Sequence, residues 1–330
     1  MGKSYPDRTN ARGIWNVNEI SKDKILNGNW PGNFGTPGGR GMFGGGLTPT
    51  TVDTVDYITI STEGNATDFG NLQSADRYGC TGSGSTTRGL FCGGGTNSNV
   101  EDTIDYFTIA STGNATDFGN LTGSNRSAGA FGNQTRCFNA GGSSNSAYVN
   151  IIEFVSIAHT GNGTDFGDLS ANNDSGSSGV NSPTRGIVMG GISFNNRIEF
   201  IEMSSSGGHT DFGNLSSTRG NVAGMSNSTR GICAGGRNPT FSNVIEYITI
   251  SALGNATDFG NLTSATSYVA GCNNFTRGAV GGGSTPTIVN TIDFITMASA
   301  GDAADFGDLS QARRYLSGLS NAHGGLSQGY

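Results

Sequence analysis

The stretch Gly64-Asn65-Ala66-Thr67-Asp68-Phe69-Gly70-Asn71-Leu72, which reads GNATDFGNL, decides the fold because the chain repeats it. The same nine letters return at 113–121 and 254–262, and looser copies stand at 161–169, 208–215 and 302–309. The Asp of the phrase falls at 68, 117, 165, 211, 258 and 305, at steps of 49, 48, 46, 47 and 47 residues. Self-similarity at such a period indicates an array of equivalent structural units.

Two further phrases run in step with the first. An Arg-led run that ends in Gly-Gly, such as RGLFCGGG, starts at Arg40, Arg88, Arg136, Arg185, Arg230 and Arg277. An apolar run of the form VDYITI starts at Val55, Ile104, Ile152, Ile198, Ile245 and Ile292. A fourth segment, such as RYGCTGS, follows each TDFG phrase. The four segments of each unit predict four short strands. We therefore expect an all-β, six-bladed propeller over 40–322, with repeats starting near 40, 88, 136, 185, 230 and 277.

Composition supports this class and excludes others. Glycine supplies 56 of 330 residues, and the 34% of hydrophobic residues come in short, evenly spaced runs that disordered tracts lack. The net charge of −7 without a basic patch argues against a nucleic-acid partner, and no apolar run reaches the roughly 20 residues that a membrane span needs. The beginning of the chain has no secretory leader. Five cysteines without a CxxC pair indicate buried free thiols in a reducing compartment.

The TDFG phrase has a mainly architectural interpretation. We expect each Phe to anchor the next blade, each Asp to cap a turn by accepting backbone N–H bonds, and each Gly to permit close backbone approach. The residues are Asp68, Phe69, Asp117, Phe118, Asp165, Phe166, Asp211, Phe212, Asp258, Phe259, Asp305 and Phe306. The alternative is a ring of six carboxylates that binds cations, although the ligand clustering of calcium loops is missing.

The repeated Arg is expected to open the innermost strand of every blade. Each unit also has an acidic residue at the second position of its VDYITI-type run, namely Asp56, Asp105, Glu153, Glu199, Glu246 or Asp293. Six charges of each sign predict ion pairs that hold blade to blade, because an unpaired buried charge is costly. The alternative is a positive collar around the channel mouth that attracts an anionic sugar or phosphate.

The repeat resembles the kelch family. Gly93-Gly94, Asp105-Tyr106 and Phe118 occupy the places of the family's Gly-Gly, acidic-aromatic and Trp positions in the second unit, and the other units match. All six units depart from the family by having Phe where it has Trp. The resemblance covers about Arg40 to Ser320 and implies a kelch-like propeller, an architecture that hosts many unrelated activities.

Residues 1–39 do not belong to the repeat. They hold all three lysines and both tryptophans, and an amphipathic stretch contains Val17, Ile20, Lys24 and Ile25. Gly13, Ile14, Trp15, Val17, Glu19, Trp30 and Pro31 make the segment similar to tail and other virion proteins of tailed bacteriophages, marine ones in particular. The resemblance implies an anchoring and assembly segment that binds other virion subunits or a second copy of the chain through Trp15, Val17, Ile20, Trp30 and Pro31. The alternative is a flap that packs on the propeller.

Catalytic patterns are missing from the sequence. His159, His209 and His323 fall at unrelated repeat positions, and no Ser-His-Asp set, HExxH or P-loop is present. We expect no enzyme activity, no cofactor and no metal.

The expected function is that of a phage virion structural protein, in a tail fibre or near the baseplate, whose propeller recognises a host-surface glycan or protein. It would be made in the host cytoplasm and lie on the tail or another external surface, as a homo-oligomer. The turns 47–51, 96–101 and 238–243, with those before each repeat Arg, are the expected binding loops. The alternatives are a capsid-decorating or fibre-forming protein without a receptor role, and a cellular kelch-type interaction module. The tail 323–330, or part of the N-terminal segment, is expected to close the ring.

Overall fold

Six four-stranded antiparallel sheets form a β-propeller, as predicted. The computed structural model describes residues 38–73, 77–172, 178–191 and 195–326. The anchoring residues expected at 15–31, and the amphipathic stretch around them, lie outside the described residues.

Each blade has four strands, ordered from the channel outward. The innermost are β26 (Ser317–Ser320), β6 (Thr81–Gly84), β10 (Gly129–Gly132), β14 (Ser178–Asn181), β18 (Ala223–Ser226) and β22 (Ala270–Asn273). The second strands are β1 (Arg40–Gly44), β7 (Arg88–Gly95), β11 (Arg136–Ala140), β15 (Arg185–Met189), β19 (Arg230–Ala234) and β23 (Arg277–Gly281). The third strands are β4 (Thr54–Thr59), β8 (Val100–Thr108), β12 (Ile151–Ser156), β16 (Arg197–Glu202), β20 (Val244–Thr249) and β24 (Thr291–Thr296).

The outermost strands carry the TDFG phrase. They are β5 (Thr67–Asn71), β9 (Thr116–Asn120), β13 (Thr164–Asp168), β17 (Thr210–Asn214), β21 (Thr257–Asn261) and β25 (Ala304–Asp308). A small hairpin of β2 (Leu47–Thr48) and β3 (Thr50–Thr51) lies between β1 and β4. The blades are numbered one to six, from the sheet β26-β1-β4-β5 to the sheet β22-β23-β24-β25.

The order of strands corrects one expectation. The repeat Arg opens the second strand of a blade and not the innermost one, because the last strand of each sequence repeat crosses over to become the innermost strand of the next blade. Strand β6, for example, follows β5 in the chain but pairs with β7. Each sequence repeat is therefore shared between two blades, and neither half can complete its sheet alone.

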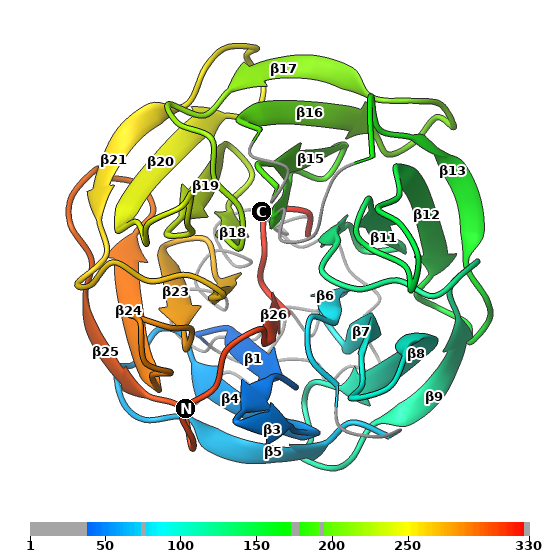
Figure 1. Ribbon diagram of the computed structural model, residues 1–330, viewed down its shortest axis with the longest axis horizontal. Coiled ribbons are helices and arrows are strands. Elements are labelled where there is room, and N and C mark those ends of the chain that lie inside the picture. The colour runs from blue at the N-terminus through cyan, green and yellow to red at the C-terminus, as the bar shows by residue number, and fades with distance from the viewer. Residues whose placement is uncertain (1–37, 74–76, 173–177, 192–194, 327–330) are drawn as a thin grey trace, which may run out of the picture. The chain divides into compact units, whose positions relative to one another are not determined.

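The ring closes by the same crossover. Strand β26 pairs with β1 from Gly41↔Ser320 to Gly44↔Ser317, so the last repeat supplies the innermost strand of blade one. The six innermost strands contact one another in succession all the way round, and Figure 1 shows β26 beside β1 at the centre of the ring. Residues 317–320, just before the expected closing tail, thus close the ring.

The hydrophobic core lies between blades. One cluster joins Met42, Val55 and Phe69 of blade one to Phe91 and Phe107 of blade two, and similar clusters join other successive blades. Phe69 makes edge-to-face contacts with Tyr57 in its own blade and with Phe107 in the next, at centroid distances of 5.7 and 5.5 Å. The repeated Phe therefore contributes to the packing of blade against blade.

All five cysteines are buried and free, as the odd count predicts. Among the residues that the structure describes, no helix is long and apolar enough to cross a membrane.

Candidate functional site

The GNATDFGNL phrase forms an inter-blade clasp, in which one copy of the phrase binds the next. The N–H groups of Gly113 and Ala115 donate to the carbonyls of Phe69 and Asn71 at 2.8 and 2.9 Å, and Asn71 N–H donates to Oδ1 of Asn114 at 3.1 Å. Equivalent backbone bonds join all six pairs of successive blades. The first half of each phrase thus binds the second half of the preceding copy.

The glycine of TDFG is required by this clasp. Gly70 has φ of +145°, and a Cβ there would collide with the carbonyl oxygen of Gly113 in the next blade. The Asp residues take no such part, since side chains such as Asp68 and Asp117 are exposed. The expected capping by these Asp is wrong, because five of the six clasps use the Asn or Asp after the Gly of the next turn instead, and the fourth copy of the phrase has Gly208 at that place.

The repeat Arg side chains also bridge blades, but not by the predicted ion pairs. Arg88 Nη1 donates to the carbonyl of Ile157 in the next blade at 2.9 Å, and its guanidinium lies over the ring of Tyr106. All six guanidinium carbons lie 4.4–5.0 Å from the centroid of the aromatic residue on the third strand. The pairing with the third-strand acids is wrong because the antiparallel register sets Arg40 opposite Thr59, whereas Asp56 lies opposite Phe43.

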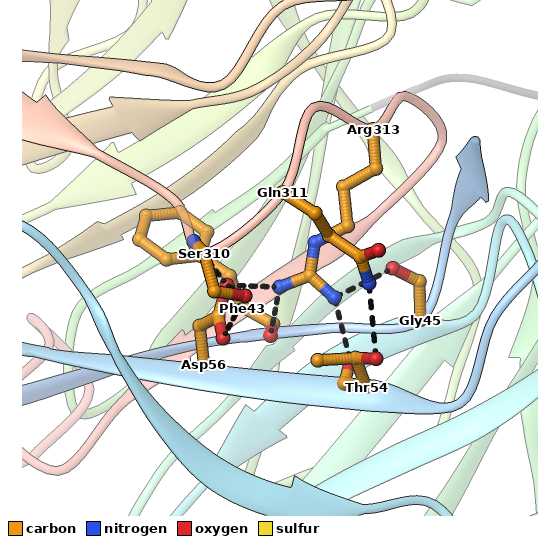
Figure 2. A network of polar contacts seen from close by, with 7 residues as sticks. All are labelled: Phe43, Gly45, Thr54, Asp56, Ser310, Gln311 and Arg313. Atoms are coloured by element: carbon orange, nitrogen blue, oxygen red, sulfur yellow. Dashed lines mark hydrogen bonds and ion pairs between the residues drawn. The ribbon is translucent and has the colours of Figure 1, made fainter.

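Other arginines neutralise three of the third-strand acids. Arg313, Arg77 and Arg219, which precede innermost strands, pair with Asp56, Asp105 and Glu246 respectively. Figure 2 shows the closing member of this set: Arg313 Nη2 lies 2.9 Å from Asp56 Oδ2, and the guanidinium also donates to the carbonyls of Phe43, Gly45 and Thr54. Because Arg313 precedes β26, this network fastens the last repeat to blade one.

Two of the remaining acids, Glu153 and Asp293, rely on neutral donors, whereas Glu199 has Arg197 Nη1 at 3.9 Å and His209 Nε2 at 3.8 Å. Thr122 N–H donates to Glu153 at 2.7 Å, and Thr263 donates to Asp293 through both its N–H and its hydroxyl. Burial raises the pKa of Glu153, Asp293 and Asp105, and the Asp opposite on the outer strand raises it further. This happens because each third-strand acid lies opposite the Asp of a TDFG phrase, as Asp56 lies opposite Asp68. Within the described ranges no cluster of three or more potential metal ligands occurs, and the carboxylate-ring alternative finds no support.

One mouth of the central channel is covered by the plug, which is the segment 321–326. His323 Nε2–H donates to the Gly84 carbonyl at 2.8 Å, and its Nδ1 accepts from Asn181 and from Gly325 N–H at 3.3 Å. Gly324 N–H donates to the Ser226 carbonyl at 2.7 Å. Burial lowers the pKa of His323 from 6.5 to about 4. The neutral imidazole therefore holds the plug against the ends of several innermost strands.

The opposite mouth is formed by the collar, which is the set of residues that stand two positions before an innermost strand. Its described members are Gly79, Ser127, Asn221, Tyr268 and Tyr315. All have φ between +53° and +63°. Tyr315 N–H donates to the Tyr268 carbonyl and Gly79 N–H to the Tyr315 carbonyl, at 3.0 and 2.7 Å. The collar is thus held by backbone bonds between successive blades, and its side chains differ.

Between plug and collar lies a cavity of about 130 Å³. Tyr268 and Tyr315 line it at the collar, and His323 lines it at the plug. The innermost strands that wall it approach closely, since a Cβ on Gly318 would collide with the Gly271 carbonyl. Because the plug covers one mouth, the collar mouth is the other approach to this space among the described residues.

The predicted binding loops do not form one surface. In an antiparallel blade the first and third turns lie at one end and the second turn at the other. The turns before each repeat Arg therefore lie on the plug side, while 47–51, 96–101 and 238–243 lie on the collar side with the crossovers to the next blade. Only the second group can surround the open mouth. Tyr268 and Tyr315 were missed because only two repeats have Tyr at this position; a bulky residue where another repeat has Gly79 was the available clue.

Searches against models of known families and against curated proteins found no match for this chain.

Proposed function

We propose that the chain is a phage virion structural protein, in a tail fibre or near the baseplate, whose propeller recognises a glycan or protein on the host surface. The resemblance of residues 13–31 to virion proteins supports the anchoring half of this proposal. A rigid ring of repeated blades supports the display half, because recognition residues work best on a scaffold that does not move.

The observation that carries the proposal is the contrast between scaffold and mouth. Clasp and arginine positions are nearly identical in all six repeats, whereas the five described collar positions hold four residue types. Packing does not demand this variety, since Gly79 and Tyr315 have the same backbone conformation. Variable side chains around an open mouth on a uniform scaffold are the arrangement that recognition requires.

The test is to label intact phage particles from the source culture with gold-conjugated antibodies against the propeller. Label at the tail tip or fibres is the expected result, and free protein should then block adsorption. Label over the head would overturn the receptor role in favour of capsid decoration. Absence of label from every particle would overturn the virion assignment and favour a cellular interaction module.

A further inference from the structure

Six side chains form a continuous aromatic and basic arc at the collar mouth. The arc consists of Tyr78, Arg126, Arg237, Tyr268, Arg314 and Tyr315. The rings of Tyr268 and Tyr315 lie 4.2 Å apart, and that of Tyr78 lies 5.7 Å from Tyr315. Arg314 lies over both Tyr268 and Tyr315, at 5.7 and 5.8 Å from their centroids. Contributions thus come from four sequence repeats, the fifth, sixth, first and second, although these residues lie far apart in the sequence.

The guanidinium groups of the arc lack acidic partners. Arg237 Nη1 donates to the Tyr268 hydroxyl at 2.6 Å, and Arg126 donates to the Tyr78 hydroxyl. None of Arg126, Arg237 and Arg314 forms an ion pair with another described residue, unlike Arg313 beneath them. Each guanidinium has five N–H donors, so donors remain after these bonds. Among the described residues the arc therefore presents three half-buried positive charges without an acidic partner.

The two central tyrosines are placed against the preference of the backbone. Tyr268 and Tyr315 have φ of +63° and +57°, a left-handed conformation that is an outlier for bulky residues. Gly79 and Asn221, at equivalent collar positions, adopt the same conformation with little strain. The fold can thus be built without an aromatic residue there, and such outliers concentrate at ligand sites.

We propose that the arc binds an anionic sugar residue of a host-surface glycan, and this inference rests on the proposed function. The faces of Tyr268 and Tyr315 would pack against the apolar face of the sugar ring. Arg237 and Arg314 would pair with its carboxylate or sulfate, since a planar guanidinium matches such groups with two parallel hydrogen bonds. The cavity beneath, of about 130 Å³, has room for a small polar substituent with its water.

The test measures binding of the full chain, by calorimetry, to three oligosaccharides of equal length: oligogalacturonate, a sulfated dextran fragment and neutral maltooligosaccharide. Oligoglutamate of the same charge is the fourth probe. We expect one or both anionic sugars to bind, more weakly at higher salt, and the other two probes not to bind. The two anionic probes separate carboxylate from sulfate recognition. Equal binding of oligoglutamate, or failure of both anionic sugars, would overturn the proposal.

Variants are chosen from residues that the chain itself uses at equivalent positions, so that folding is retained. Arg237→Ser with Arg314→Ser copies Ser284 and Ser267, and Tyr268→Asn copies Asn221. Loss of a charge-assisted hydrogen bond should weaken binding about tenfold or more. The control Arg197→Thr copies the Thr at the start of β24 and removes one charge, whose nearest acid is Glu199 at 3.9 Å, from the third strand of blade four. Equal affinity of arc variants and control would place the site elsewhere.

The two proposals fail separately. Tail labelling without binding of either anionic sugar leaves the virion role and removes the sugar site. Arc-dependent sugar binding without label on any particle keeps the site and removes the virion role.

Discussion

The clasp and the collar both join successive blades, and they differ in how far their sequences are constrained. The clasp has backbone hydrogen bonds between all six pairs of blades, and the described part of the collar, from Asn221 round to Ser127, is held by backbone hydrogen bonds as well. In the clasp a Cβ at Gly70 meets the backbone of the next blade, whereas at Gly79 in the collar its nearest contact is only the Ser127 hydroxyl. The same residues therefore recur in every repeat where the backbones of two blades are in contact, and the side chains differ between repeats where they face the mouth.

The largest effect is expected beneath the collar, where buried partners also differ between blades. Arg313→Met leaves Asp56 buried without its cation, and the free energy of unfolding should fall by about 3–5 kcal/mol. Thr266→Val, at the equivalent position before β22, should cost only about 1 kcal/mol. Urea denaturation of both variants checks this. Equal losses of unfolding free energy in the two variants would show that the blades do not differ at this position. Adding Asp56→Asn to Arg313→Met should recover part of the loss, because the unpaired charge is then removed.

The plug should make the stability of the protein depend on pH, through His323, and the collar has no histidine among its described members. His323 stays neutral in the folded chain down to about pH 4, while the unfolded chain takes up its proton near pH 6.5. Stability should therefore fall by about 3 kcal/mol as pH drops from 6.5 to 4. The measurement is the difference in unfolding free energy between wild type and His323→Gln from pH 8 to 4, in which the carboxylates cancel. A difference that stays constant with pH would show that the imidazole does not support the plug.

The clasp can be tested with two glycines that share a positive φ. Gly119 has φ of +144° and its Cβ would collide with the Gly161 carbonyl, whereas Gly113 has φ of +156° and open space around it. Gly119→Ala should cost about 2 kcal/mol more than Gly113→Ala, because only the first combines backbone strain with a clash. Thermal unfolding of both variants measures the difference. Similar losses would mean that φ alone, rather than the contact, preserves the phrase.

The smallest effect is expected in the collar itself. Tyr268→Asn should raise the free energy of unfolding by about 0.5–1 kcal/mol, since Asn tolerates the left-handed backbone that Tyr resists. Chemical denaturation beside wild type checks the sign. A clear loss of stability would instead assign Tyr268 a structural role and remove the contrast with the clasp.

The sequence was sufficient to predict the strands of the blades, and it was insufficient to predict how the blades are connected. Six aligned phrases predict six four-stranded units, because each strand has its own pattern of apolar residues and turns. The exchange of the innermost strand was not predictable, since nothing between β5 and β6 states which sheet β6 joins. Arg88 was assigned the wrong partner because equal numbers of positive and negative residues do not show which residues lie opposite each other in a sheet. Arg77 and the arc escaped attention because only some repeats have them.

The crossover that closes the ring also sets a delay during synthesis. The 272 residues of 45–316 separate β1 from β26, so a ribosome needs roughly 14–54 s to supply the strand that covers the inner edge of β1. Throughout that interval blade one presents an open edge, which is the usual site of wrong strand pairing. The β26 of a second chain fits the same edge, so crowded nascent chains should exchange this strand. A rising yield of dimer when refolding is carried out at increasing protein concentration would reveal that exchange.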